Sequence, residues 1–202
     1  APAAAAERTL EVAASYIWMQ PSGDTTVLAG NPAEEHELAL SSDTGYGVSG
    51  LLFFGNFAAE LSVAQIESSL EIAAADDEPR PAAPSRSRIM PVTLALQYHF
   101  APDAMIDPYI GVGAMTIMTS DPEDIPTTGV AVTAFEADDY GYLVSAGLAV
   151  EMTETIGVIL DAKYVPSGIA TRATINTPAG TTADIDMNPI MVSIGVSWRW
   201  GR

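Results

Sequence analysis

The sequence has 202 residues, of which 48% are hydrophobic and 17% charged, and it contains no cysteine. Its 26 acidic and 8 basic residues give a net charge of −18, which argues strongly against nucleic-acid binding because that requires a basic surface. No apolar run approaches the ~20 residues of a membrane-spanning helix. The absence of cysteine gives no hint of a disulfide framework or a thiol-based site.

The chain begins with an alanine-rich segment, APAAAAE. Small residues of this kind are typical of a mature N-terminus left after signal-peptide cleavage, although a disordered alanine-rich tail describes the same residues. We therefore expect a flexible N-terminus over 1–8 and a single domain over 9–200 of an exported protein.

Apolar residues then alternate with small or polar ones, which is the period of a β-strand. The alternation predicts eight strands, at about 9–19, 44–54, 57–72, 89–100, 107–118, 140–152, 156–164 and 187–200, with the seventh able to extend beyond Pro166 to about Ile175. The last run, from Met187 to Trp200, places apolar residues and two tryptophans on one face. Its other face is small or polar and ends in Arg199.

The connections between these strands alternate in length. Short turns are expected at Gly55-Asn56, 102–106 and 153–155, and long polar loops at about 21–43, 74–88, 119–139 and 176–186. This asymmetry is typical of an all-β, eight-stranded antiparallel transmembrane β-barrel with short periplasmic turns and long extracellular loops. The prediction is a barrel in the outer membrane of a Gram-negative bacterium, with both termini periplasmic.

The aromatic residues of the outward faces fall into two groups, as the two interfaces of a bilayer require. The group beside the short turns or the C-terminus comprises Phe54, Phe57, Phe100, Trp198 and Trp200. The group beside the long loops comprises Trp18, Tyr46, Tyr140, Tyr142 and Tyr164. A soluble barrel has no reason to sort its outward aromatics into two rings.

The inward-facing residues of the predicted barrel differ between the lower lumen, near the short turns, and the upper lumen, near the long loops. The lower lumen is polar and charged, with Glu11, Glu60, Gln97, His99, Glu151 and Arg199, and with Asp161 and Lys163 somewhat higher. A selectivity gate or a catalytic site is one interpretation; we favour a plug, because an eight-stranded barrel is narrow and side chains fill it. Buried charges must be paired, so Arg199 is expected to bind one or more of Glu11, Glu60 and Glu151.

The upper lumen is apolar and rich in methionine. Its candidate ligand-binding residues are Ile17, Met19, Ile89, Met115, Ile117, Met187 and Met191, with Ile66 and Val165 beside them. Methionine adapts to irregular apolar ligands. The same residues could equally pack on one another beneath the loops.

Signals for catalysis and metal binding are weak. His36 and His99 lie at opposite ends of the predicted barrel, and no nucleophile can be placed beside His36. The loop acids Asp121, Glu123 and Asp124 carry the oxygen ligands that Ca²⁺ prefers, but their spacing fits no EF-hand, so a solvated acidic face is expected. We predict neither an enzyme nor a cofactor or metal site.

Four segments resemble the OmpW family of outer-membrane proteins: PVTLALQYHF (91–100), DPYIGVGAM (107–115), SAGLAVEMTETIGVILDAKY (145–164) and NPIMVSIGVSWRW (188–200). The resemblance implies an eight-stranded barrel with a hydrophobic channel that passes small apolar molecules inward and releases them sideways through its wall. Family members usually end in Phe, whereas here Trp200 takes that place before Gly201-Arg202. The outer loops are unusually acidic and proline-rich, so family loop contacts are not carried over.

A lateral exit would need a weak place in the strand pairing, and proline supplies one because it lacks an N–H group. Pro91, Pro166 and Pro189 lie near the outer strand ends and are the candidates, although prolines at such places can simply mark strand starts.

The sequence thus predicts a barrel that binds or conducts small hydrophobic molecules. The alternative is a closed structural barrel whose acidic outer loops dock partners in an envelope assembly; an outer-membrane enzyme ranks third. The expected partners are outer-membrane lipid, lipopolysaccharide and small hydrophobic solutes, with envelope proteins as further candidates.

Overall fold

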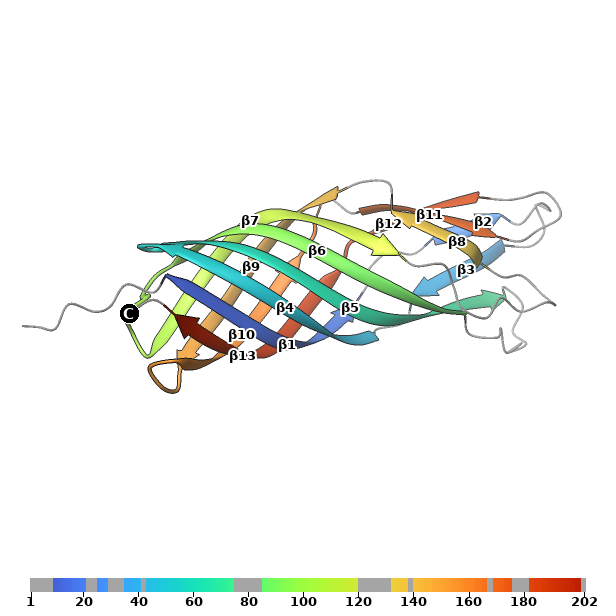
Figure 1. The fold of residues 1–202 in the computed structure, drawn as a ribbon. Coiled ribbons are helices and arrows are strands. Elements are labelled where there is room, and N and C mark those ends of the chain that lie inside the picture. The colour runs from blue at the N-terminus through green and yellow to red at the C-terminus, as the bar shows by residue number, and fades with distance from the viewer. Residues whose placement is uncertain are drawn as a thin grey trace, which may run out of the picture.

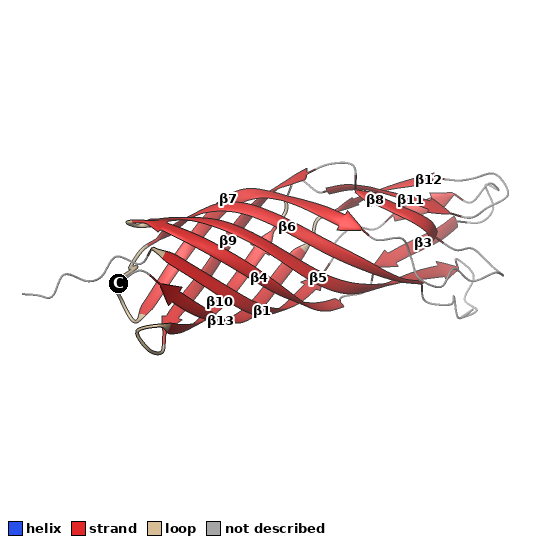
Figure 2. Cartoon of the chain, viewed as in Figure 1, coloured by secondary structure: helices blue, strands red, loops and turns tan. Residues whose placement is uncertain are grey.

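The computed structural model describes residues 9–20, 25–28, 35–40, 43–74, 85–119, 132–137, 140–166, 169–175 and 182–200. Every regular element in these ranges is a β-strand (Figure 2). Within them, no helix is long and apolar enough to cross a membrane. The segment 1–8, expected to be flexible, lies outside the described residues.

Eight of the strands form a closed antiparallel barrel, as predicted (Figure 1). They are β1 (Leu10–Gln20), β4 (Asp43–Phe54), β5 (Phe57–Ala74), β6 (Ser85–His99), β7 (Ile106–Thr119), β9 (Tyr140–Glu151), β10 (Ile156–Tyr164) and β13 (Ile190–Trp200). Around the wall they run β5-β4-β1-β13-β10-β9-β7-β6, and the pairing of β6 with β5 closes the ring. The first and last barrel strands are neighbours, from Leu10 opposite Trp200 to Gln20 opposite Ile190.

The outward faces of the barrel strands carry mainly apolar side chains. Leu94, Leu96 and Val112 leave about half or more of their surface exposed, while their inward neighbours Ala95 and Thr93 are buried. Such a surface is unfavourable in water and is the one that lipid requires. All ten aromatic residues of the two predicted girdles are exposed on this wall.

Aromatic rings also touch along and across strands on this wall. At the turn end, Tyr98 meets Phe100 edge to face with ring centroids 5.1 Å apart, and Phe57 lies against Tyr98. At the other end, Tyr16 contacts Trp18 and Tyr46 in the same way. Edge-to-face pairs are favourable for aromatic quadrupoles, so these contacts stabilise part of each girdle.

The three short turns form as predicted. Gly55 adopts a φ of 64°, which the tight turn to Asn56 needs and which glycine permits without strain. The side chain of Asn56 donates a hydrogen bond to the carbonyl of His99 at 2.8 Å, tying this turn to the next hairpin. In the third turn, the backbone N–H of Ile156 donates to the hydroxyl of Thr153 at 3.0 Å.

The long polar stretches were expected to be loops, and here the prediction is wrong in part. They contain β2 (Thr25–Leu28), β3 (Glu35–Leu40), β8 (Val132–Ala137), β11 (Ile169–Ile175) and β12 (Thr182–Met187). These strands gather at the end of the barrel opposite the short turns (Figure 1). β12, β11 and β8 form a separate three-stranded sheet.

The pairing of β3 with β5 has a simple physical cause. β5 runs on past the end of its pairing with β4 at Ile66, which would leave a free edge. β3 covers that edge, from Leu40 opposite Leu70 to His36 opposite Ala74. A backbone that extends beyond the wall thus finds new strand partners for its N–H and C=O groups.

Two predicted strand limits also change. The segment 187–200 is not one strand, because β12 ends at Met187 and β13 begins at Ile190. The extension of the seventh strand to Ile175 is likewise a separate strand, β11, since β10 ends at Tyr164. Both breaks coincide with a proline, which cannot donate to a strand partner.

A pair of adjacent substitutions can test which side chains of β6 face the lipid and which face the lumen. We expect Leu96→Arg to lower the free energy of unfolding in a bilayer by about 2–4 kcal/mol, because it places a charge in the hydrocarbon layer. Ala95→Ser, next to it on the buried face, should cost little. Urea unfolding in phospholipid vesicles measures both, and equal effects would refute the assignment.

Candidate functional site

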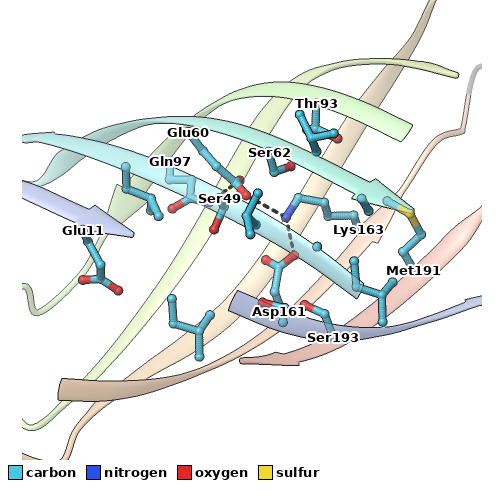
Figure 3. Close-up of a pocket in the computed structure, with 18 of the residues that line it drawn as sticks. Glu11, Ser49, Glu60, Ser62, Thr93, Gln97, Asp161, Lys163, Met191 and Ser193 are labelled. Atoms are coloured by element: carbon cyan, nitrogen blue, oxygen red, sulfur yellow. Dashed lines mark hydrogen bonds and ion pairs between the residues drawn. The ribbon is translucent and has the colours of Figure 1, made fainter. Parts of the chain in front are cut away.

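Lys163 lies at the centre of the lumen and joins two carboxylates from opposite sides of the barrel. Its Nζ donates to Oε1 of Glu60 at 3.0 Å and to Oδ1 of Asp161 at 2.6 Å (Figure 3). Glu60 comes from β5, whereas Asp161 and Lys163 come from β10. The lysine therefore bridges strands that are not neighbours in the wall.

A chain of hydrogen bonds continues from this centre to the turn end. The amide Nε2 of Gln97 donates to Oε2 of Glu60 at 2.7 Å. The Oε1 of Gln97 lies 3.1 Å from Nε2 of His99, whose Nδ1 lies 2.7 Å from Oδ2 of Asp107. Because all four side chains are buried, each polar contact compensates for hydration lost on folding.

Tyr109 connects His99 in this chain back to Asp161, which Lys163 also binds. Its hydroxyl donates to Oδ2 of Asp161 at 2.8 Å, and its ring stacks on that of His99 with centroids 4.9 Å apart. On the other side, Phe53 meets His99 edge to face. The imidazole is thus fixed both by hydrogen bonds and by aromatic packing.

Gly147 makes the Tyr109–Asp161 contact possible. It lies on β9 directly opposite Tyr109 on one side and directly opposite Asp161 on the other. A Cβ at this position would collide with the Tyr109 ring. The tyrosine therefore crosses over β9 where that strand has no side chain.

Arg199 forms a second ionic cluster near the turn end. Its Nε donates to Oε2 of Glu11 at 2.9 Å, and its Nη1 lies 3.3 Å from Oε2 of Glu151. The predicted pairing is confirmed for these two acids. Glu60, the third candidate, is held instead by Gln97 and Lys163.

These two clusters together form what we call the polar floor: Glu11, Glu60, Gln97, His99, Asp107, Tyr109, Glu151, Asp161, Lys163 and Arg199. Its charged groups come from six of the eight barrel strands, and Lys163 and Arg199 each bind carboxylates from more than one strand. A narrow barrel filled in this way has side chains rather than a water channel at its turn end. Within the described residues, no group of three or more His, Asp or Glu could hold a metal ion.

A cavity in the lumen extends from among the side chains of the polar floor to Pro91 and Met191 (Figure 3). Its base is lined by seven residues of the polar floor, and its upper part includes Ile17 and Met191. The seven are Glu11, Glu60, Gln97, His99, Tyr109, Asp161 and Lys163. Its wall also carries hydroxyl residues, which are Ser15, Ser49, Ser62, Thr93 and Ser193. The cavity is therefore charged at its base, hydroxylic in the middle and apolar above.

The predicted ligand-binding residues divide into two groups. Ile17 and Met191 line the cavity. Met19, Ile89, Met115 and Ile117 face inward but are at most 3% exposed and do not line it, so in this structure they fill the lumen beyond. Met187 lies in β12, outside the barrel wall, and its side chain is outside the described part of the chain.

The three candidate prolines occupy different positions. Pro166 follows the end of β10 and is exposed. Pro189 stands between β12 and β13, where its carbonyl accepts the N–H of Val165 at 3.2 Å. Both lie at strand ends.

Pro91 differs because it is buried within β6 and lines the cavity. The pairing of β5 with β6 runs up to Val63 opposite Val92 and resumes at Ile66 opposite Ile89. Pro91 and Met90 face Ala64 and Gln65 in the gap between them. The wall therefore has an unpaired step beside the cavity.

Asp107, Tyr109 and Phe53 were not predicted as lumen residues. Counting back in steps of two from Met115, an inward residue of β7, leads to Tyr109 and Asp107, so the alternation held this signal. The hydroxyl residues of the cavity were also not singled out. The acids Asp121, Glu123 and Asp124 lie outside the described residues, as does the side chain of His36.

Comparisons with known proteins agree with this architecture. The model of the OmpW family matches residues 7–200. Outer membrane protein AlkL of Ectopseudomonas oleovorans is 26% identical over 109 residues, 54% of this chain and 45% of that relative, so the matched part spans about half of each.

Solved structures show the same fold at low identity. OprG from Pseudomonas aeruginosa has a TM-score of 0.76 at 19% identity, with 98% of both chains covered. AlkL in lipid bilayers has a TM-score of 0.70 at 20% identity, covering 100% of this chain and 95% of that one. E. coli outer membrane protein W has a TM-score of 0.54 at 15% identity, covering 96% and 99%. With the family model matched over the whole barrel, the chain belongs to the OmpW family of outer-membrane β-barrel proteins.

Proposed function

We propose that this barrel conducts small hydrophobic molecules from its outer end into the lumen and releases them sideways into the membrane beside Pro91. The cavity carries this proposal, because it is lined by apolar residues above the floor and reaches Val63, Ala64 and Pro91 at the unpaired step of the wall. A solute in that cavity lies next to the unpaired step, where residues 64–65 of β5 and 90–91 of β6 interrupt the pairing of these two strands.

The polar floor supports a lateral rather than an axial route. An apolar solute passing toward the turn end would have to separate ion pairs such as Lys163–Asp161 and Arg199–Glu11. Breaking a buried pair costs several kcal/mol, roughly 3–5, and an apolar solute offers nothing in return. The wall beside Pro91 presents no such barrier.

Access from the outer end requires side chains to move. Met19 and Met115 are each 1% exposed and lie directly opposite the cavity residues Met191 and Thr93. Methionine is unbranched and changes rotamer readily, so these residues can yield to a solute and close behind it. In the orientation that we propose for the barrel in the outer membrane, the short turns and both termini are periplasmic. The strands beyond the wall, which are β2, β3, β8, β11 and β12, then face the lipopolysaccharide layer.

The alternative is a closed structural barrel, without enzymatic activity, that docks envelope partners. The same observation favours it: the side chains of Met19, Ile89, Met115 and Ile117 fill the outer lumen. A barrel with this function would pass no solute at all, so a transport experiment separates the two proposals.

The experiment measures uptake of n-octane and of a small sugar by cells that produce the barrel and otherwise lack family members. We expect octane uptake to rise above that of cells without the barrel and sugar uptake to stay unchanged. Ala64→Phe, which fills the cavity, should abolish the gain, whereas Ala59→Phe on the outward face of the same strand should not.

Folding of both variants is checked by their resistance to unfolding in detergent on a gel. If sugar uptake rises with octane uptake, the lumen is a water-filled pore. If neither rises, the structural barrel is the better account.

A further inference from the structure

Three hydroxyl residues form a continuous row across neighbouring strands inside the cavity. Ser49 of β4 lies directly opposite Ser62 of β5, which lies directly opposite Thr93 of β6. All three line the cavity beside Lys163 (Figure 3). We call them the hydroxyl row.

The position of the row is defined on both sides. Glu60 of the polar floor is two residues before Ser62, and Ala64 at the unpaired step of the wall is two residues after it. On β6, Thr93 is likewise two residues from Pro91. The row thus lies between the charged floor and the place where we propose that solutes leave.

None of the three hydroxyls makes a hydrogen bond to a side chain or backbone group within the described residues. Thr93 is only 1% exposed, yet it lines the cavity, so its unpartnered hydroxyl is directed there. Ser49 and Ser62 are half-buried and line the same cavity. Three adjacent hydroxyls without a protein partner would not be expected in a channel that handles only hydrocarbons, because their polar groups gain nothing from an apolar solute. The row is therefore a set of unused donors and acceptors that face the solute path.

The charges around the row determine which polar group fits. The carboxylates that line the cavity are Glu11, Glu60 and Asp161, against the single ammonium of Lys163. That ammonium already binds both Glu60 and Asp161. An anionic head group would meet an excess of negative charge, with no free cation among the residues that line the cavity, and repulsion is strong in a lumen of low dielectric constant.

We infer that the cavity binds small amphiphiles with an uncharged oxygen-bearing head, such as a medium-chain alcohol, ketone or ester. The head hydrogen-bonds to Ser49, Ser62 and Thr93, and the tail extends along Ile17 and Met191. The inference rests on the proposed function for the route of the solute, and it adds a preference for neutral amphiphiles over fatty carboxylates. Water in the row is the competing occupant.

The test compares 1-octanol, n-octane and octanoate in the uptake experiment, with the wild type and a triple variant, Ser49→Ala, Ser62→Ala and Thr93→Val. Thr93→Val keeps the shape of the side chain and removes only the hydroxyl. We expect the triple variant to take up octanol about tenfold more slowly, since neutral hydrogen bonds each contribute a severalfold factor, and to take up octane as the wild type does. Octanoate uptake should be low in both.

Thr44→Val is the matched control, because it removes an exposed hydroxyl from the end of β4 outside the cavity. Its octanol uptake should equal that of the wild type. Octanol uptake that is unchanged in the triple variant, or that falls together with octane uptake, would overturn the inference.

A binding measurement keeps the inference separate from the transport proposal. In the purified barrel in lipid nanodiscs, we expect a nuclear Overhauser contact between the carbon-1 protons of labelled octanol and the methyl group of Thr93. If the wild type transports nothing but this contact is present, the transport proposal fails and the binding site stands. If octane is transported and the contact is absent, the transport proposal stands and the hydroxyl row holds water.

Discussion

Replacing Arg199 by methionine is expected to lower the free energy of unfolding by about 3–5 kcal/mol, because it leaves the buried carboxylate of Glu11 and the half-buried carboxylate of Glu151 without their cation. Glu11 is 1% exposed and accepts from Nε of Arg199 at 2.9 Å, and Glu151 lies 3.3 Å from Nη1. Methionine keeps most of the apolar volume, so the loss reports on the charge rather than on a cavity. Urea unfolding in phospholipid vesicles, followed by tryptophan fluorescence, measures it.

Two further variants separate charge from hydrogen bonding. Arg199→Lys keeps the cation but loses the forked guanidinium, so its cost should be smaller than that of methionine. Adding Glu11→Leu to Arg199→Met removes one of the two acids that have lost their cation, and it should recover part of the free energy of unfolding. A methionine variant within about 1 kcal/mol of the wild type would mean that Glu11 is solvated, against its burial in the structure.

The barrel wall could be predicted from the sequence because lipid imposes a simple rule on it. Every outward residue must be apolar, so the alternation along β6, β9 and β13 is nearly unbroken. Whether a residue faces the lipid or the lumen then follows from its odd or even position along the strand. The pairing of Arg199 with Glu11 could be predicted for the same reason, since both lie on inward positions at the same end of neighbouring strands.

The strands beyond the wall could not be predicted in the same way. β3 is a strand because β5 extends past β4 and offers an edge, and β11 is a strand because β12 and β8 lie on either side of it. These causes are distant in the sequence and carry no lipid-imposed alternation. Polar composition alone therefore indicated loops.

The cavity depends on the cross-section of the barrel, which no single strand reveals. The alternation along the strands predicted that both Met19 and Met191 face the lumen, but only Met191 lines the cavity. The role of Gly147 needs three strands at once, because Tyr109 and Asp161 meet across it. Asp107 was assigned to the start of a strand beside a turn, where its contact with His99 carries no local signal.

The second large effect concerns the wall beside Pro91. Val63 and Val92 are directly opposite each other, next to the unpaired step. We expect that joining them, as Val63→Cys with Val92→Cys after oxidation, will reduce octane uptake to that of cells without the barrel. The bond prevents β5 and β6 from separating where the solute leaves, and reduction should restore uptake.

Two control pairs show whether the effect is local. Leu61→Cys with Leu94→Cys joins the same two strands two residues nearer the turns. Tyr164→Cys with Ile190→Cys joins β10 to β13 beside Pro166 and Pro189. Both should leave uptake largely intact, because these places lie away from the unpaired step.

The rate of octane uptake through the oxidised Val63–Val92 variant, relative to its reduced form, is the most direct test of a lateral route. The proposed route predicts that uptake is lost on oxidation and regained on reduction. Equal uptake in the two forms would contradict it. If uptake also survives the Tyr164–Ile190 bond, no lateral exit at any of the three prolines is tenable, and the barrel is better regarded as a closed structural one.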